Sequence, residues 1–149
     1  MRIEGSDGDE SDTRSVFRVK QKVLFRHCDP AGIVFYPRYF EMINDCVEAF
    51  FADHLAWPFE AVHGEGAVPT AEISATFRRV SRHGDRLVLS LSHGTPGRTS
   101  LGLAFAATCG EELRFTARST IVNVDAAGKP TPWPAHVRER LTRDSGDFA

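Results

Sequence analysis

The stretch that decides how the chain is interpreted reads Phe25-Arg26-His27-Cys28-Asp29-Pro30-Ala31-Gly32-Ile33-Val34-Phe35-Tyr36-Pro37. Pro30 has no backbone N–H and Gly32 favours turn conformations, so a strand cannot continue through this stretch and the chain turns here. A strand with one wet face is expected before the turn, over residues 16–25. Pro37 is well suited to the first turn of a helix that follows.

The pattern after the turn predicts one long helix over residues 37–55. Apolar side chains recur there at steps of three and four, at Tyr39, Phe40, Ile43, Cys46, Val47, Phe50 and Phe51. This apolar stripe is wider than a surface helix needs, so another element is expected to wrap around it. Trp57-Pro58-Phe59 ends the helix, and residues 63–66, with two glycines, are expected to form a flexible loop over a neighbouring site.

Beyond residue 69 the hydrophobic period changes from about 3.6 to about 2, which is typical of strands. Four alternating runs each predict a strand with one buried face, at residues 71–77, 87–91, 101–107 and 113–124. Short connections join them, at residues 81–85, 94–97 and 110–112. Consecutive strands are therefore expected to be antiparallel neighbours in a four-stranded meander. A weak helix over residues 135–143 is expected to close the fold.

These elements predict an α+β fold in which a curved antiparallel sheet of about five strands is laid around one long helix. A single helix cannot cover both faces of such a sheet. We therefore expect a second copy of the chain to cover the other face and at least one sheet edge, in a homodimer or a homotetramer. Residues 14–144 are expected to form the single domain, after a disordered acidic leader over residues 1–13 and before a tail over residues 145–149.

Composition excludes several classes of function. The 149 residues fit one globular domain, and no apolar run approaches the ~20 residues of a membrane span. No secretory signal pattern is present, so we expect a cytoplasmic protein. Lys and Arg number 18 against 20 Asp and Glu, and this net charge of -2 argues against nucleic-acid binding. The three cysteines lack the spacing of a zinc site or a disulfide framework, so free thiols and no metal are expected.

Asp29 is the main candidate for catalysis. It lies in the turn, seven residues before Tyr36 at the expected start of the helix. Backbone N–H groups at a helix start have no partner within the helix and lie at the positive end of its dipole, so they can bind a developing oxyanion. A carboxylate facing such donors is half of an acyl-transfer site. The alternative is that Asp29 only caps the turn before Pro30.

Residues 25–40, with the core D-P-A-G-I-V-F-Y-P, resemble the opening motif of the 4-hydroxybenzoyl-CoA thioesterase family of hotdog-fold proteins, and the order of elements agrees over about residues 16–125. The resemblance implies a dimerising hotdog fold that hydrolyses an acyl-CoA to the free acid and CoA without a cofactor. In that family the Asp of D-P-A-G is the catalytic carboxylate, and the backbone N–H at the Tyr of F-Y-P polarises the thioester carbonyl. The matching residues are Asp29, acting as nucleophile or general base, and Tyr36.

Binding of CoA phosphates by a chain of net charge -2 requires a local group of cations. Basic side chains gather around one predicted turn, at Arg78, Arg79, Arg82, His83 and Arg86, and Arg98 and Ser100 lie in the next. We expect these two turns to hold the phosphates, although a charge run at a hairpin can also simply be solvated. The family often has a basic residue directly before this serine, where the chain has Thr99.

The acyl group is expected to meet flat aromatic side chains, at Phe35, Tyr39, Trp57 and Phe59, with His63 in the loop above them. Such rings suit a 4-hydroxybenzoyl or benzoyl-type group through offset stacking. A short or medium aliphatic acyl group is the alternative, and the rings can equally be ordinary core residues. The sequence does not distinguish CoA from a carrier protein as the donor of the acyl group.

Other catalytic mechanisms are less favoured by the sequence. Cys28 lies between His27 and Asp29, but neighbours at a strand end point to opposite faces, which disfavours a cysteine triad. A metal held by His27 and Asp29 with His54 or His63 lacks further ligands at suitable spacing. On the helix, Glu41 or Asp45 is a second candidate for a catalytic acid. The alternative functions are an enoyl-thioester hydratase or dehydratase that pairs Asp29 with a histidine, and a non-catalytic acyl-thioester binding module.

Overall fold

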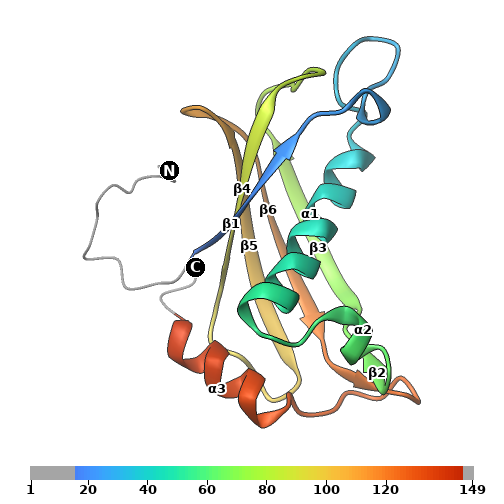
Figure 1. The fold of residues 1–149 in the computed structure, drawn as a ribbon, viewed down its shortest axis with the longest axis vertical. Coiled ribbons are helices and arrows are strands. Elements are labelled where there is room, and N and C mark those ends of the chain that lie inside the picture. Colours follow the sequence, from blue (N-terminus) through green and yellow to red (C-terminus); the bar gives the residue numbers. More distant parts are fainter. Residues whose placement is uncertain (1–15, 146–149) are drawn as a thin grey trace.

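The computed structural model describes residues 16–145, which include a five-stranded antiparallel sheet and a long helix against it (Figure 1). The expected leader over residues 1–13 lies outside the described residues. The strands of the sheet are β1 Phe17–Lys22, β3 Thr70–Phe77, β4 Arg86–His93, β5 Ser100–Cys109 and β6 Glu112–Val122, in the order β1-β4-β5-β6-β3. The predicted α+β architecture is confirmed.

The long helix begins at the predicted proline. It consists of α1 Pro37–Ala49 and continues without a break into a wider π-helical turn, η2 Phe50–His54. Its buried face includes Met42, Cys46 and Phe51, which join the leucines of β4 and β5 in one core. Burial of each such side chain contributes about 1.5–3 kcal/mol, so the contact between helix and sheet accounts for much of the fold's stability.

The sheet order differs from the predicted meander at one place. The consecutive strands β4, β5 and β6 are antiparallel neighbours as expected, but β3 pairs with β6 and β4 pairs with β1 and β5. The prediction that β3 and β4 are neighbours is therefore wrong. The connection runs over residues 78–85, and eight residues easily span the roughly 14 Å of three strand spacings.

β3 is an edge strand without a buried face in this chain, so the prediction of one buried face is wrong for this strand. Seven of its eight residues are exposed, and the side chains of Ile73 and Phe77 keep 39% and 43% of their accessible surface. The physical reason is its position at the end of the sheet, beside β6 only. An apolar edge of this kind is a surface suited to association.

The expected flexible loop over residues 63–66 is an ordered connection. After α2 Phe59–Val62, the strand β2 Gly66–Ala67 pairs with β7 Val124–Asp125. A Cβ atom on Gly66 would lie 2.2 Å from the carbonyl oxygen of Val124, so the glycine permits close approach of two backbones. The prediction of a flexible loop at Gly66 is wrong because this glycine is used for pairing.

The remaining elements are short. A 3-10 turn, η1 Phe25–His27, ends the region that was expected to be strand, and the closing helix α3 Ala135–Asp144 confirms the prediction over residues 135–143. α3 is anchored by the buried side chains of Val137 and Leu141. Among the described residues, no helix is long and apolar enough to cross a membrane.

Candidate active site

Asp29 lies in a small hairpin between η1 and α1. Cys28 and Val34 form an antiparallel bridge, and the N–H of Asp29 donates to the carbonyl oxygen of Ile33 at 3.0 Å. Gly32 closes the turn with a φ of +83°, a conformation that glycine adopts at little cost, and its N–H donates to the Asp29 carbonyl oxygen at 2.9 Å. The predicted turn is therefore present, and backbone hydrogen bonds with Ile33 and Gly32 hold Asp29 in it.

The Asp29 carboxylate has one engaged oxygen. Oδ1 accepts a hydrogen bond from the N–H of Ala31 at 2.9 Å, and the residue is half-buried. This is the turn-capping geometry that the sequence left open as the alternative. Within residues 16–145, Oδ2 accepts no hydrogen bond. The cap thus fixes the direction of the side chain through one oxygen and leaves the second for other contacts.

The backbone N–H of Tyr36 is the free donor at the start of α1. Arg38 N–H donates to the carbonyl oxygen of Phe35 at 2.8 Å, and Tyr39 N–H donates to that of Tyr36 at 3.0 Å. Pro37 has no N–H. The amide of Tyr36 donates no hydrogen bond within the described residues. The expected group of free helix donors is therefore reduced to one at Tyr36.

The carboxylate and the free amide belong to the same hairpin. The N–H of Phe35 donates to the carbonyl oxygen of His27 at 2.9 Å, so residues 27–29 run alongside residues 33–35. Tyr36 follows directly on this second side. Asp29 and the Tyr36 amide are therefore carried by one short segment of chain.

Exposed aromatic rings surround the start of α1. Phe35 and Tyr36 keep 46% and 58% of their surface, and the centroids of Tyr36 and Phe77 are 6.1 Å apart. Phe77 also lies 6.3 Å from Phe40. Tyr39 is buried beneath Phe77, and the centroids of the two stacked rings are 5.4 Å apart. Tyr39 is therefore a core residue that contacts this aromatic cluster. Sequence reasoning missed Phe77, although it was assigned to a strand, because its neighbour across space was unknown.

The other aromatic candidates lie at the far end of the helix. Trp57 and Phe59 pack on Phe51, with centroids at 6.0 and 5.4 Å, and His63 is exposed beside Phe59. The 18 residues of α1 and η2 give a length of about 27 Å. One chain therefore does not bring Phe35 and Tyr39 together with Trp57, Phe59 and His63.

The two predicted phosphate turns also lie apart. In the connection between β3 and β4, the side chains of Arg78 and Arg82 are exposed and form no ion pair or side-chain hydrogen bond among the described residues, whereas Arg79 Nε lies 3.9 Å from Glu112 Oε2. Arg98 and Ser100 lie at the other end of β4, where their carbonyl oxygens accept hydrogen bonds from Trp133 at 3.4 and 3.2 Å. Eight residues of β4, about 26 Å, separate these turns.

His27 has a structural role. Its side chain is buried, and Nδ1 accepts a hydrogen bond from the N–H of Leu24 at 2.8 Å, which closes η1. Burial, followed by the nearby charge of Arg26, lowers the pKa of His27 below its ordinary value. A neutral imidazole engaged in this way is a poor partner for Asp29 in a hydratase. Cys28 makes a similar local contact, its Sγ lying 3.7 Å from the Leu24 carbonyl oxygen.

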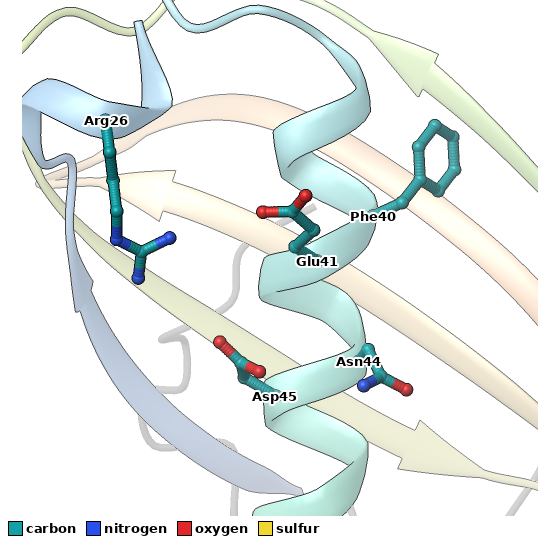
Figure 2. A pocket seen from close by; sticks show the side chains of 5 residues that line it. All are labelled: Arg26, Phe40, Glu41, Asn44 and Asp45. Atoms are coloured by element: carbon teal, nitrogen blue, oxygen red, sulfur yellow. The ribbon is translucent and has the colours of Figure 1, made fainter.

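The acidic residues of α1 line an open hollow of about 550 Å³, with Arg26, Phe40 and Asn44 as the other lining residues (Figure 2). Arg26 points toward the carboxylates of Glu41 and Asp45, and Glu41 also pairs with Arg38 at 2.8 Å. Among residues 16–145, no group of three His, Cys, Asp or Glu side chains is placed to hold a metal ion.

A family model described as "Thioesterase-like superfamily" matches residues 23–141, which is most of the chain. The chain belongs to this superfamily, and its fold is the hotdog fold of thioester hydrolases. No curated protein matches the sequence significantly.

Solved structures share the fold at low sequence identity. Slr0204, a 1,4-dihydroxy-2-naphthoyl-CoA thioesterase from Synechocystis, is 18% identical with a TM-score of 0.79, and the match covers 85% of this chain and 96% of that one. A 4-hydroxybenzoyl CoA thioesterase mutant complexed with 4-hydroxybenzoyl CoA is 23% identical with a TM-score of 0.74, covering 85% and 98%. The gentisyl-coenzyme A thioesterase BH1999 is 22% identical with a TM-score of 0.74, covering 83% and 98%.

Proposed function

We propose that this protein hydrolyses an aromatic acyl-CoA to the free acid and CoA, with Asp29 as the catalytic carboxylate and the Tyr36 backbone N–H as the oxyanion donor. The observation that carries the proposal is the unbonded Tyr36 amide at the start of α1, in the same hairpin that holds Asp29 by its backbone and by one carboxylate oxygen. Superfamily membership supplies the reaction class.

The chemistry follows from these two groups. The thioester carbonyl oxygen rests on the Tyr36 N–H, while Asp29 either attacks the carbonyl carbon or removes a proton from an attacking water. Negative charge develops on the carbonyl oxygen, and a positioned donor at such a site is worth on the order of 3 kcal/mol. The C–S bond then breaks and CoA leaves as a thiolate. In the nucleophilic route, water hydrolyses the resulting mixed anhydride.

The aromatic cluster at the start of α1 supports an aromatic acyl group. Phe35, Tyr36, Phe40 and Phe77 present ring surface beside the hairpin, and stacking of an aromatic group is worth about 0.5–1.5 kcal/mol beyond burial. Three structures of similar fold are named as acting on, or complexed with, hydroxylated aromatic acyl-CoAs. A benzoyl or 4-hydroxybenzoyl group is the first substrate to test, and short or medium aliphatic groups are the alternative.

Two further parts of the proposal concern binding and assembly. Arg78 and Arg82 are the cations best placed to meet CoA phosphates, because they are exposed on the connection that packs against the Asp29 hairpin. Arg98 and Ser100 join that site only if a second copy of the chain brings them there. The exposed apolar edge of β3, with Ile73 and Phe77, supports a homodimer or homotetramer, which a measurement of mass in solution tests directly.

The decisive experiment measures thiol release from benzoyl-CoA, 4-hydroxybenzoyl-CoA and hexanoyl-CoA. Asp29→Asn is expected to lower kcat by about 1,000-fold or more while leaving the folded state intact. Asp125→Asn is a matched control, because Asp125 also accepts a backbone N–H from two residues ahead, at 2.9 Å, but lies at the end of β7. Blanks without substrate correct for protein thiols, and Cys46 contributes little because burial raises its pKa to about 12.

The outcomes separate the alternatives. Turnover that survives in Asp29→Asn contradicts the assignment and directs attention to Glu41 or Asp45. Saturable binding of acyl-CoA without thiol release indicates a binding module. Water addition to an enoyl-CoA without thiol release indicates a hydratase.

A further inference from the structure

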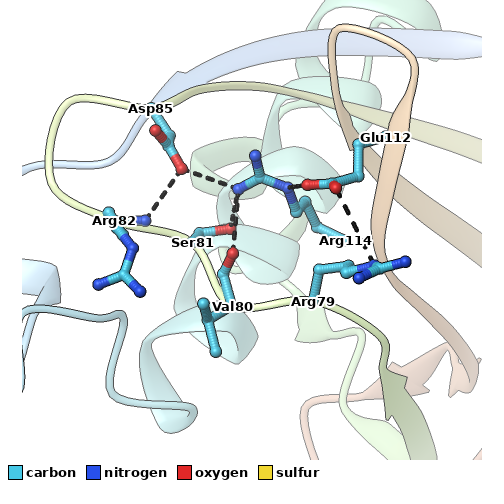
Figure 3. A network of polar contacts seen from close by, with 7 residues as sticks. All are labelled: Arg79, Val80, Ser81, Arg82, Asp85, Glu112 and Arg114. Carbon is cyan, nitrogen blue, oxygen red and sulfur yellow. Dashed lines mark hydrogen bonds and ion pairs between the residues drawn. The ribbon is translucent and has the colours of Figure 1, made fainter.

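Arg114 is the centre of a polar network on the connection between β3 and β4 (Figure 3). Its side chain, only 11% exposed, projects from β6. Nη1 donates to Asp85 Oδ2 at 2.8 Å, to Ser81 Oγ at 2.9 Å and to the Val80 carbonyl oxygen at 3.2 Å. Nε donates to Glu112 Oε1 at 2.8 Å. A guanidinium with acceptors on several sides is held in one orientation and holds those acceptors in turn.

The backbone of Arg114 binds the same connection. Its carbonyl oxygen accepts hydrogen bonds from the N–H groups of Arg78 and Arg79, at 2.7 and 3.2 Å. Residues 78–85 are not paired as a hairpin, and these contacts hold their beginning, while hydrogen bonds of Gly84 and Asp85 with the Val23 backbone, both at 2.8 Å, hold their end. At their end, Asp85 Oδ2 also accepts the N–H of Arg82 at 3.0 Å, and the hydrogen bond from Arg114 is the main cause that lowers the pKa of Asp85.

This connection in turn supports the hairpin of Asp29. The N–H of Val34 donates to the Ser81 carbonyl oxygen at 2.9 Å, and Ile33 forms an antiparallel bridge with Arg82. Residues 33–35 are therefore held between the connection on one side and residues 27–29 on the other. The Asp29 N–H bonds to Ile33, and Tyr36 follows Phe35 directly. A continuous series of contacts thus links Arg114 to both groups of the proposed site.

We propose that Arg114 is a positioning residue, which fixes residues 78–85 and through them the Asp29 hairpin and the Tyr36 amide. The proposal rests on the proposed function. Arg114 touches neither Asp29 nor Tyr36, and its effect on catalysis is through the geometry of the hairpin. Displacement of reacting groups by about 1 Å can reduce a rate by about 100-fold.

The test combines kinetics with hydrogen exchange on the full-length protein. Arg114→Gln is expected to lower kcat per folded molecule by about 10–100-fold. It is also expected to speed amide exchange at Val34 and Asp29 by about 10-fold or more, while exchange in β5 stays unchanged, because the loosening is local. Arg114→Lys keeps the positive charge near Asp85 but loses the planar guanidinium and its several N–H donors. Its effects on kcat and on amide exchange are therefore expected to lie between those of the wild type and Arg114→Gln.

Asp144→Asn is the matched control, because it removes the carboxylate that contacts His54 Nε2 at the opposite end of the fold. It should change neither kcat nor exchange at Val34. If Arg114→Gln does not fold, Ser81→Ala removes one acceptor of the network and is expected to show the same two effects in smaller measure. Unchanged kcat or unchanged exchange at Val34 in Arg114→Gln, or in Ser81→Ala if Arg114→Gln does not fold, overturns the proposal.

Amide hydrogen exchange tests the positioning role of Arg114 independently of the proposed function. If the wild-type protein releases thiol from no acyl-CoA, the proposed function fails, and the link from Arg114 to the hairpin is still decided by exchange at Val34 and Asp29. If Asp29→Asn abolishes turnover but Arg114→Gln changes neither measurement, the function stands and the positioning role is wrong.

Discussion

The two ends of the long helix differ in how fully their polar and aromatic groups are used within the chain. At the start of α1, the Tyr36 amide donates no hydrogen bond to any residue from 16 to 145, and Phe35 is 46% exposed. At the other end, Phe51 is completely buried and His54 forms a hydrogen bond with Asp144. Groups left unsatisfied can bind a substrate, whereas packed and bonded groups stabilise the fold. In the proposed function, the first end therefore binds the substrate, whereas the second end stabilises the fold.

The largest expected effect is on the free energy of unfolding, which should differ between removal of the buried Phe51 ring and removal of the exposed Phe35 ring. Phe51→Ala is expected to lower the free energy of unfolding by about 3–5 kcal/mol, since it leaves a cavity in the core. Phe35→Ala is expected to lower it by less than about 1 kcal/mol and to raise the KM for benzoyl-CoA. Urea unfolding and steady-state kinetics measure both. If the two variants lose equal free energy of unfolding, the proposed difference between the two ends of the helix is wrong.

A second prediction sharpens the description of the far end as an ordered region. Gly66→Ala is expected to lower the free energy of unfolding by about 1–3 kcal/mol, because the added Cβ would lie 2.2 Å from the Val124 carbonyl oxygen. Gly64→Ala is the control, with its nearest contact at an ordinary 3.4 Å, and should change stability little. If Gly66→Ala proves as stable as the wild type, residues 63–66 behave as the flexible loop that sequence analysis expected.

The smallest effect is a dependence of stability on pH at the far end. His93 is buried beside Phe50, and its Nδ1 contacts the Gly94 carbonyl oxygen at 2.8 Å. Burial is the main cause that lowers its pKa, with the charge of His54 acting in the same direction and that of Asp144 opposing it. At pH values between the folded and the unfolded pKa of His93, the unfolded chain therefore binds more protons than the folded chain.

Stability should consequently fall as pH decreases below the ordinary histidine pKa of about 6.5 toward the lower folded value. Urea unfolding at about pH 7.5 and about pH 5.5 measures the loss. His93→Gln should make that loss smaller, although His27 contributes in the same direction. His136→Gln, at an exposed position of α3, should retain the wild-type difference. An unchanged difference in His93→Gln contradicts the assignment of pH dependence to the buried histidine.

Local patterns in the sequence predicted much of the fold and the centre of the site. Pro30 and Gly32 indicated the turn, steps of three and four indicated the helix, and alternation indicated β4 and β5, all of which the structure contains. Asp29 and Tyr36 were selected by spacing and by resemblance to a known motif. These features depend on neighbouring residues, so one sequence suffices to predict them.

The errors concern contacts between distant segments. β3 was expected beside β4, and the loop at Gly66 was expected to be flexible. Each outcome depends on which segment arrives from elsewhere in the chain: β6 beside β3, and β7 beside Gly66. Sequence periodicity contains no information on such partners.

The sequence by itself therefore determined where the chain turns, which faces are apolar and which carboxylate precedes the helix, because backbone stereochemistry and side-chain polarity act over a few residues. Only the tertiary structure decided that, within the part of the chain that the structure describes, the Tyr36 amide donates no hydrogen bond, and that Arg114 supports the hairpin of Asp29 through Ser81 and Asp85. Hydrogen bonds between residues about thirty positions apart exist only after the sheet and helix have packed, since packing alone brings donor and acceptor within reach.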